Sequence, residues 1–222
     1  MTEDDTAPAP KHAARNWLLG AGFAALVVIA GAVYVMQTGY GNLAGGTATA
    51  CKGSVERAKA LDGLNTGQMA AFQLADTPQF IGDLAFDDGD GNRTGLADHA
   101  GQTVLLNLWA TWCAPCREEM PELDKLEAEL GGDDFKVLPV SVDIGDAGKP
   151  KAFYAETGLE HLPFRHDGTM TVFNDLKKKS LAIGMPTTLL IDGEGCVLGH
   201  LAGPAAWASA DAKDLVRAAI GK

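Results

Sequence analysis

Two cysteines separated by two residues are the strongest chemical signal in this sequence. The segment Cys113-Ala114-Pro115-Cys116 follows an apolar run of strand length and precedes a segment with helical periodicity. A cysteine at a helix N-terminus faces unpaired backbone N–H groups and the positive end of the helix dipole, which lower its thiol pKa. Pro115 suits the first turn, where its missing N–H costs nothing. We therefore predict that Cys113 is the nucleophile and that Cys116 resolves the mixed disulfide formed there.

The elements that must hold this pair alternate between strand and helix. Residues 104–109 form an apolar run typical of a strand buried on both faces, and residues 116–130 have the spacing of an amphipathic helix. Residues 137–142 predict a second strand, in which Pro139 requires a bulge or an unpaired position. Further helices are predicted at 54–61, 151–157, 172–179 and 207–220, one hairpin at 84–93, and another with strands 187–191 and 196–202. The order βαβ, then αββα, predicts an α/β fold.

The N-terminal part differs from the rest in composition. Residues 17–36 contain no charge, and a helix of that length spans about 30 Å, the thickness of the hydrocarbon core. Lys11 and Arg15 precede this segment, and the next basic residue is Lys52. We predict a cytoplasmic segment at 1–16, one transmembrane anchor at 17–37, a flexible linker at 38–50 and an exported domain at 51–222.

Three other interpretations of the apolar segment stay open. A cleaved signal peptide has an apolar stretch of about 7 to 15 residues. This stretch is longer, and Ala48-Thr49-Ala50 lies well beyond its end. Lipidation at Cys51 is disfavoured because the leucine usual before such sites is missing. A buried core helix is disfavoured by apolarity on every face beside a Gly-rich linker.

Length and charge narrow the class of protein. A chain of 222 residues allows one globular domain with appendages. The formal net charge of −11 disfavours nucleic acid as a partner, because phosphate backbones would be repelled. Cys51 and Cys196 remain after the reactive pair is set aside, and spare thiols in an exported domain more often pair than stay free. We predict a structural disulfide worth about 4 kcal/mol, the alternative being two distant thiols.

The longer pattern around the cysteines resembles a known family. Residues 107–121 read NLWATWCAPCREEMP, and residues 184–188 read GMPTT. Both are similar to the membrane-anchored thioredoxin-like proteins of the TlpA, ResA and CcmG group, most of all to the TlpA branch, over residues 80–220. The resemblance implies a thioredoxin fold with an N-terminal extension, preceded by one transmembrane helix. It also implies a redox-active cysteine pair that needs no cofactor and no metal.

The resemblance assigns roles to further residues. It implies that Pro186 is cis and packs against the active disulfide, leaving nearby backbone free to pair with a substrate strand. Trp112, Met185 and Gly203 would border this groove together with Pro115. The family's catalytic glutamate matches Glu119, for which an exposed first-turn position favoured by the helix dipole is an equal alternative. Asn107 replaces the buried acid of ordinary thioredoxins and is expected to be structural.

The direction of electron flow follows from the residues between the cysteines. Ala-Pro lacks a group that would favour a strong oxidant, so we expect a reductase with a potential of about −270 to −200 mV. The resemblance implies a membrane dithiol donor of the DsbD or CcdA kind at the bacterial inner membrane, with the catalytic domain in the periplasm. It implies disulfide-bearing substrates of cytochrome maturation: an oxidase copper-site subunit, a copper chaperone or an apocytochrome.

Two other functions are alternatives to the reductase. A Cu(I)-binding metallochaperone on the same fold would use both thiolates, although such relatives space their cysteines three residues apart and add a distal histidine. A peroxidase would need a Pro-x-x-x-Thr-x-x-Cys loop, which is missing from the sequence. His161 and His166 are expected to be loop residues rather than metal ligands. Trp109 is expected in the core, and Lys177-Lys178-Lys179 at a solvated helix end.

Overall fold

The computed structural model describes residues 51–222. The predicted cytoplasmic segment, membrane span and linker lie outside this range. Within residues 51–222, the apolar helices are all too short to cross a bilayer.

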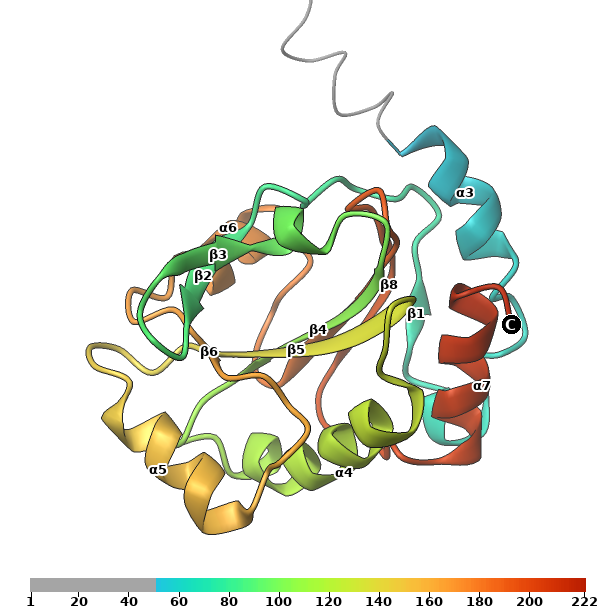
Figure 1. Ribbon diagram of the computed structural model, residues 1–222. Helices are drawn as coiled ribbons and strands as arrows, with labels where there is room; N and C mark the ends of the chain where they lie inside the picture. The colour runs from blue at the N-terminus through green and yellow to red at the C-terminus, as the bar shows by residue number, and fades with distance from the viewer. Residues whose placement is uncertain (1–50) are drawn as a thin grey trace, which may run out of the picture. The chain divides into compact units, whose positions relative to one another are not determined.

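The centre of the described domain is one mixed sheet (Figure 1). Its strands lie in the order β1-β8-β7-β4-β5-β6-β2-β3. Neighbours β4 and β5 are parallel, as are β5 and β6, and the other pairs are antiparallel. The strands are β1 (Gln73–Leu74), β2 (Ala85–Asp88), β3 (Arg93–Gly95), β4 (Thr103–Trp109), β5 (Phe135–Ser141), β6 (Arg165–His166), β7 (Thr187–Ile191) and β8 (Val197–Ala202).

The burial of the middle strands confirms the prediction of a sheet that is covered on both faces. All seven residues of β4 are buried, as are all five of β7. In β5, Val142 N–H donates to Trp109 O, so alternate N–H groups point toward β4 and the Pro139 nitrogen faces the other side. There β6 pairs only with Val140 and Ser141. The proline therefore occupies the unpaired position that the sequence required.

Helices cover both faces of the sheet. In Figure 1, α4 and α5 lie on one side of the central strands and α6 on the other, while α3 and α7 lie beside β1. Met120, Leu123 and Leu126 of α4 are fully buried, as its periodicity predicted. The helices are α3 (Lys52–Lys59), α4 (Ala114–Leu130), α5 (Gly148–Thr157), α6 (Thr171–Lys178) and α7 (Ala210–Ala219), with 3₁₀ turns η1 (Gly67–Met69) and η2 (Leu96–His99).

The predicted boundaries need one substantial correction. The last helix was predicted from residue 207, but α7 begins at Ala210 because Ser209 caps it, accepting a hydrogen bond from Ala212 N–H at 3.2 Å. Trp207 lies before the helix and is fully buried. The predicted hairpins at 84–93 and 187–202 are confirmed as β2–β3 and β7–β8.

A covalent bond ties the first helix to the last hairpin. Cys51, at the N-terminus of α3, forms a disulfide with Cys196, with a Cα–Cα distance of 5.7 Å. Both cysteines are buried. Arg57 of α3 also pairs with Asp192 and Glu194 in the β7–β8 turn, each at 2.9 Å. The start of the described domain is thus fixed to the sheet at two points.

The central mixed sheet, with helices on both faces and a helix that begins directly after β4, is a thioredoxin-like α/β fold. Two short strands, β1 and β6, widen the sheet beyond the elements predicted.

Candidate active site

The cysteine pair lies at the N-terminus of α4. Cys113 is the N-cap residue, and its sulfur accepts a hydrogen bond from Cys116 N–H at 3.3 Å. The two residues form a disulfide with a Cα–Cα distance of 5.3 Å. Cys113 is 7% exposed, whereas Cys116 is fully buried. Pro115 occupies the first turn of the helix, as predicted. Because Cys116 is buried, an incoming thiol or disulfide can reach only Cys113.

The loops around this disulfide leave one edge of the sheet. The loop to Cys113 leaves the end of β4, where Leu108 pairs with Thr187, the first residue of β7. Pro186 directly precedes that residue, and the Met185–Pro186 peptide bond is cis. Gly203 follows β8 and donates its N–H to Pro186 O at 2.8 Å. The sheet register therefore gathers the cysteine loop, the cis-proline loop and Gly203 at one edge.

Exposed apolar side chains gather at the same edge. Within residues 51–222, three large hydrophobic residues are exposed: Trp112 at 63%, Ile144 at 77% and Ile183 at 81%. Trp112 precedes Cys113, Ile144 follows β5, and Ile183 lies two residues before Met185, which is half-buried. The sequence singled out Trp112 and Met185 but missed the two isoleucines. A signal was present, because each isoleucine precedes a glycine in a short loop between predicted elements.

Glu119 is buried beneath the cysteines, one turn further along α4. Its Oε1 accepts a hydrogen bond from Asn107 Nδ2 at 2.8 Å, and its Oε2 accepts from Trp207 Nε1 at 3.1 Å and Ala205 N–H at 3.2 Å. Only 3% of Glu119 is exposed. Burial raises its pKa from 4.5 to about 7, and the three hydrogen bonds oppose part of that rise. This carboxyl group can therefore gain or lose a proton near neutral pH.

The alternative of an exposed glutamate at position 119 is wrong. Glu118 and Glu122 are the more exposed acids of this turn, whereas Glu119 turns inward with Cys116 and Met120. Residues three and four apart share a helix face, so positions 116, 119, 120 and 123 form one buried stripe. That spacing was the available signal for a buried glutamate.

Asn107 contacts Glu119 directly. Its side-chain amide donates to Glu119 and also to Thr188 Oγ1 at 2.9 Å, which joins β4, α4 and β7. Asn107 is fully buried, and its Oδ1 lacks a hydrogen-bond partner within the described residues. The expectation of a structural role therefore understated its place in the site.

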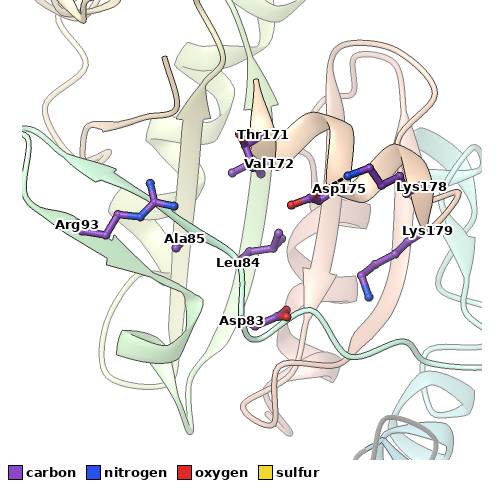
Figure 2. Close-up of a pocket in the computed structure, with 9 residues that line it drawn as sticks. All are labelled: Asp83, Leu84, Ala85, Arg93, Thr171, Val172, Asp175, Lys178 and Lys179. Atoms are coloured by element: carbon purple, nitrogen blue, oxygen red, sulfur yellow. Dashed lines mark hydrogen bonds and ion pairs between the residues drawn. The ribbon is translucent and has the colours of Figure 1, made fainter. Parts of the chain in front are cut away.

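The remaining candidates lie apart from the disulfide. His161 is exposed and pairs with Asp124 at 3.0 Å, and His166 Nε2 donates a hydrogen bond to the Asp143 carbonyl oxygen at 2.8 Å. Within residues 51–222, no cluster of three potential metal ligands occurs. A cavity of about 460 Å³ is lined by residues in and next to β2, β3 and α6, among them Asp175 and Lys178, which form an ion pair at 2.8 Å (Figure 2). None of its lining residues belongs to the active-site loops.

A thioredoxin-like sheet with a Cys-x-x-Cys disulfide at a helix N-terminus defines the class of thioredoxin-like redox proteins. The Redoxin family model matches residues 69–216, and the chain belongs to this family. The matched range contains the active pair and Cys196 but not Cys51.

Curated relatives carry redox names. The chain is 34% identical over 110 residues to the thioredoxin-like protein YneN of Bacillus subtilis, which covers 48% of this chain and 60% of the relative. It is 33% identical over 119 residues to the thiol-disulfide oxidoreductase ResA of Geobacillus thermodenitrificans, covering 52% and 63%. The matches thus span about three fifths of the relatives' length.

Solved structures give the same grouping. A putative thiol:disulfide interchange protein DsbE from Chlorobium tepidum is 28% identical with a TM-score of 0.54, over 62% of this chain and 93% of that one. A thioredoxin-family interchange protein from Chlorobium tepidum TLS is 25% identical with a TM-score of 0.52, over 62% and 93%. The predicted resemblance to the TlpA, ResA and CcmG group is confirmed for the group, while the closer match to TlpA stays a prediction.

Proposed function

We propose that this protein is a thiol:disulfide oxidoreductase that reduces cysteine pairs in exported proteins. The observation that carries the proposal is the disulfide at the N-terminus of α4, in which Cys113 is 7% exposed and Cys116 is fully buried. The buried carboxyl of Glu119 lies one turn further along the helix. Relatives named thiol-disulfide oxidoreductases support the same activity.

The proposed reaction moves two electrons from the reduced pair to the substrate. The Cys113 thiolate attacks one sulfur of the substrate disulfide, forming a mixed disulfide and releasing one substrate thiolate, which takes up a proton. Cys116 then loses its proton and attacks the Cys113 sulfur. The mixed disulfide breaks, the second substrate thiolate leaves and is protonated, and the Cys113–Cys116 disulfide forms. The structure contains this oxidised product.

Glu119 is the proposed acceptor of the Cys116 proton. Cys116 is fully buried, so solvent water has no direct access to its thiol. A carboxyl group with a pKa of about 7 is suited to accept a proton at neutral pH and to return it in the reverse direction. Its three hydrogen-bond donors hold the carboxylate in place while ionised.

The surroundings of the disulfide suit a polypeptide substrate. The backbone N–H and C=O of Met185 have no hydrogen-bond partner within residues 51–222, whereas Pro186 O is already paired with Gly203. Free backbone groups beside the reactive sulfur can pair with an extended substrate segment. Trp112, Ile144 and Ile183 add apolar contact around it.

The cellular role is proposed from the sequence pattern. An anchor at residues 17–37 would hold the domain at the periplasmic face of the bacterial inner membrane, with the N-terminus in the cytoplasm. A membrane dithiol donor of the DsbD or CcdA kind would resupply electrons. The proposed substrates are an oxidase copper-site subunit, a copper chaperone or an apocytochrome, whose cysteines must be reduced before metal or haem is bound.

Trapping with Cys116→Ser in membranes of the source organism tests the proposal. The variant cannot resolve the mixed disulfide, so a protein substrate is expected to stay attached to Cys113 until dithiothreitol is added. Cys113→Ser is the matched control and should trap nothing. Mass spectrometry of the released partners then tests their predicted class.

Two results would contradict the proposal. The first is a failure of the purified full-length protein to catalyse insulin reduction by dithiothreitol. The second is stoichiometric retention of Cu(I) that is lost in Cys113→Ser, combined with that failure, which would support the metallochaperone instead.

A further inference from the structure

The end of β5 is joined to the active-site loop through a buried carboxylate. Asp143 Oδ1 accepts a hydrogen bond from Thr111 Oγ1 at 2.6 Å, and Oδ2 accepts from Thr111 N–H at 2.9 Å. Oδ2 also accepts from Ser141 Oγ at 2.8 Å. Asp143 is 6% exposed. One side chain thus holds both the backbone and the hydroxyl of Thr111.

Thr111 lies inside the turn that delivers the nucleophile. Cys113 N–H donates to Ala110 O at 3.1 Å, which closes a turn over residues 110–113 with Thr111 and Trp112 at its centre. The Asp143 side chain binds this turn through two hydrogen bonds, which the N–H and the hydroxyl of Thr111 donate. The Ala110 carbonyl and the carboxylate together fix where Cys113 begins α4.

The three donors around the carboxylate require an acceptor without hydrogens. An ionised aspartate offers only acceptors, whereas the amide of an asparagine would direct an N–H toward the Thr111 or Ser141 donor. Replacing a charged acceptor inside such a network leaves a buried donor unsatisfied. The turn would then lose one of its attachments to β5.

We propose that Asp143 is a positioning residue, which holds the Thr111 turn so that the Cys113 sulfur stays at the N-terminus of α4. The inference rests on the proposed role of Cys113 as nucleophile. Asp143 acts through Thr111 and is not itself a catalytic residue. The same attachment joins the turn that contains Trp112 to the loop that contains Ile144, two of the exposed apolar side chains.

The chain contains a matched control for Asp143. Asp167 is 4% exposed and accepts hydrogen bonds from Thr169 Oγ1 at 2.6 Å, Thr169 N–H at 3.1 Å and Val172 N–H at 2.7 Å. It therefore has the same burial and the same number of donors, but it organises the start of α6 instead of the cysteine turn. Asp167→Asn should weaken folding to a similar degree without moving Cys113.

The test measures the reactivity of one thiol in the full-length protein in detergent. In a Cys116→Ser background, the alkylation rate of Cys113 by iodoacetamide is followed from about pH 5 to about pH 9, a range that includes the ordinary thiol pKa of about 8.5 and lower values. Asp143→Asn is expected to slow alkylation by about tenfold at neutral pH and to raise the apparent thiol pKa, because the sulfur leaves the helix N-terminus. Asp167→Asn should leave both quantities unchanged.

Substitutions at Thr111 separate positioning from charge. Thr111→Val removes the hydroxyl donor and should slow alkylation, Thr111→Ser should restore it, and Thr111→Val with Asp143→Asn should slow it less than the two effects multiplied. An unchanged or faster rate in Asp143→Asn would overturn the inference, since loss of a negative charge alone favours the thiolate. An equal slowing in Asp167→Asn would also overturn it.

This measurement needs no protein substrate. A protein that traps no partner but shows the Asp143-dependent reactivity would contradict the proposed function and leave the positioning role intact. If the protein traps substrates while Cys113 of Asp143→Asn is alkylated at the normal rate, the proposed function stands and the positioning role of Asp143 is contradicted.

Discussion

Asn107 donates a 2.8 Å hydrogen bond to the carboxylate of Glu119, across the contact between β4 and α4. An amide group does not titrate near neutral pH and cannot act as a general acid or base, so Asn107 supports the acid without replacing it. Its second bond, to Thr188, fixes the amide against β7. The buried acid of this site therefore lies on helix α4, and strand β4 provides one of its three hydrogen-bond donors.

The pH dependence of turnover tests the role of Glu119. A general base must be deprotonated, so the rate should rise as pH rises through about 7, the pKa to which burial brings this group. Glu119→Gln should abolish this rise of the rate with pH and should lower the rate of insulin reduction by about 100-fold. Rates of insulin reduction measured from about pH 5.5 to about pH 8.5, on both sides of the Glu119 pKa, check both expectations.

The control is Glu118→Gln, which changes an exposed acid on the same turn. This variant should retain both the wild-type rate of insulin reduction and its rise with pH. A Glu119→Gln profile that keeps its midpoint near 7 would assign the rise to another group.

The stability of the oxidised protein should also depend on Glu119. Its folded pKa lies above the unfolded value of 4.5, so the folded state binds the proton more tightly. The resulting stabilisation is complete below pH 4.5 and is lost as pH rises through about 7, which amounts to about 3 kcal/mol in total. A carboxyl group whose pKa is lowered on folding has the opposite effect, because its contribution to stability is lost as pH falls.

Urea unfolding at several pH values measures this effect. The free energy of unfolding of the wild-type protein should fall with pH relative to that of Glu119→Gln over this window, because all other titrating groups are shared. Parallel curves for the two proteins would show that Glu119 has an ordinary pKa.

Local sequence patterns predicted the elements that position the cysteines. The apolar run of β4 and the three- and four-residue spacing of apolar residues in α4 are local signals, and both elements lie where the sequence predicts them. Strands β1 and β6 have two residues each, so their pairing depends on neighbours distant in sequence. No local pattern contains that information.

The network around Glu119 shows the same limit. The sequence pattern predicts Trp207 as the first residue of a helix, yet its indole N–H donates a hydrogen bond to a carboxylate 88 residues away. Asp143 lies in a loop whose sequence resembles any polar turn, and its contact with Thr111 spans 32 residues. The contact between Asp143 and Thr111 follows from the parallel register of β4 and β5 rather than from composition.

The two exposed isoleucines should contribute to recognition of protein substrates. Ile144→Ser with Ile183→Ser should raise the KM for insulin by about fivefold to tenfold, because two apolar contacts are lost at the rim of the site. The kcat should change little, and so should the rate with a small disulfide such as oxidised glutathione. An equal loss with both substrates would indicate damage to the cysteines instead of lost recognition.

The buried disulfide should resist the reductants that open the active pair. Cys196 is fully buried and Cys51 is 4% exposed, so dithiothreitol should reduce Cys113–Cys116 first in the native protein. Cys51→Ser with Cys196→Ser should lower the free energy of unfolding by about 4 to 5 kcal/mol, since the bond closes a sequence separation of 145. Thermal unfolding compared with the wild type measures the loss, and an unchanged midpoint would contradict it.

The bond between Cys51 and Cys196 also makes most of the domain a covalent ring. Cys113 and Cys116 both belong to the part of the chain that this ring encloses. A protease that cuts any loop between residues 51 and 196 would therefore produce two fragments that migrate as one species without reductant. Damage of that kind would leave the reactive pair attached to the N-terminal portion of the chain, and it would be seen only after the sample is reduced.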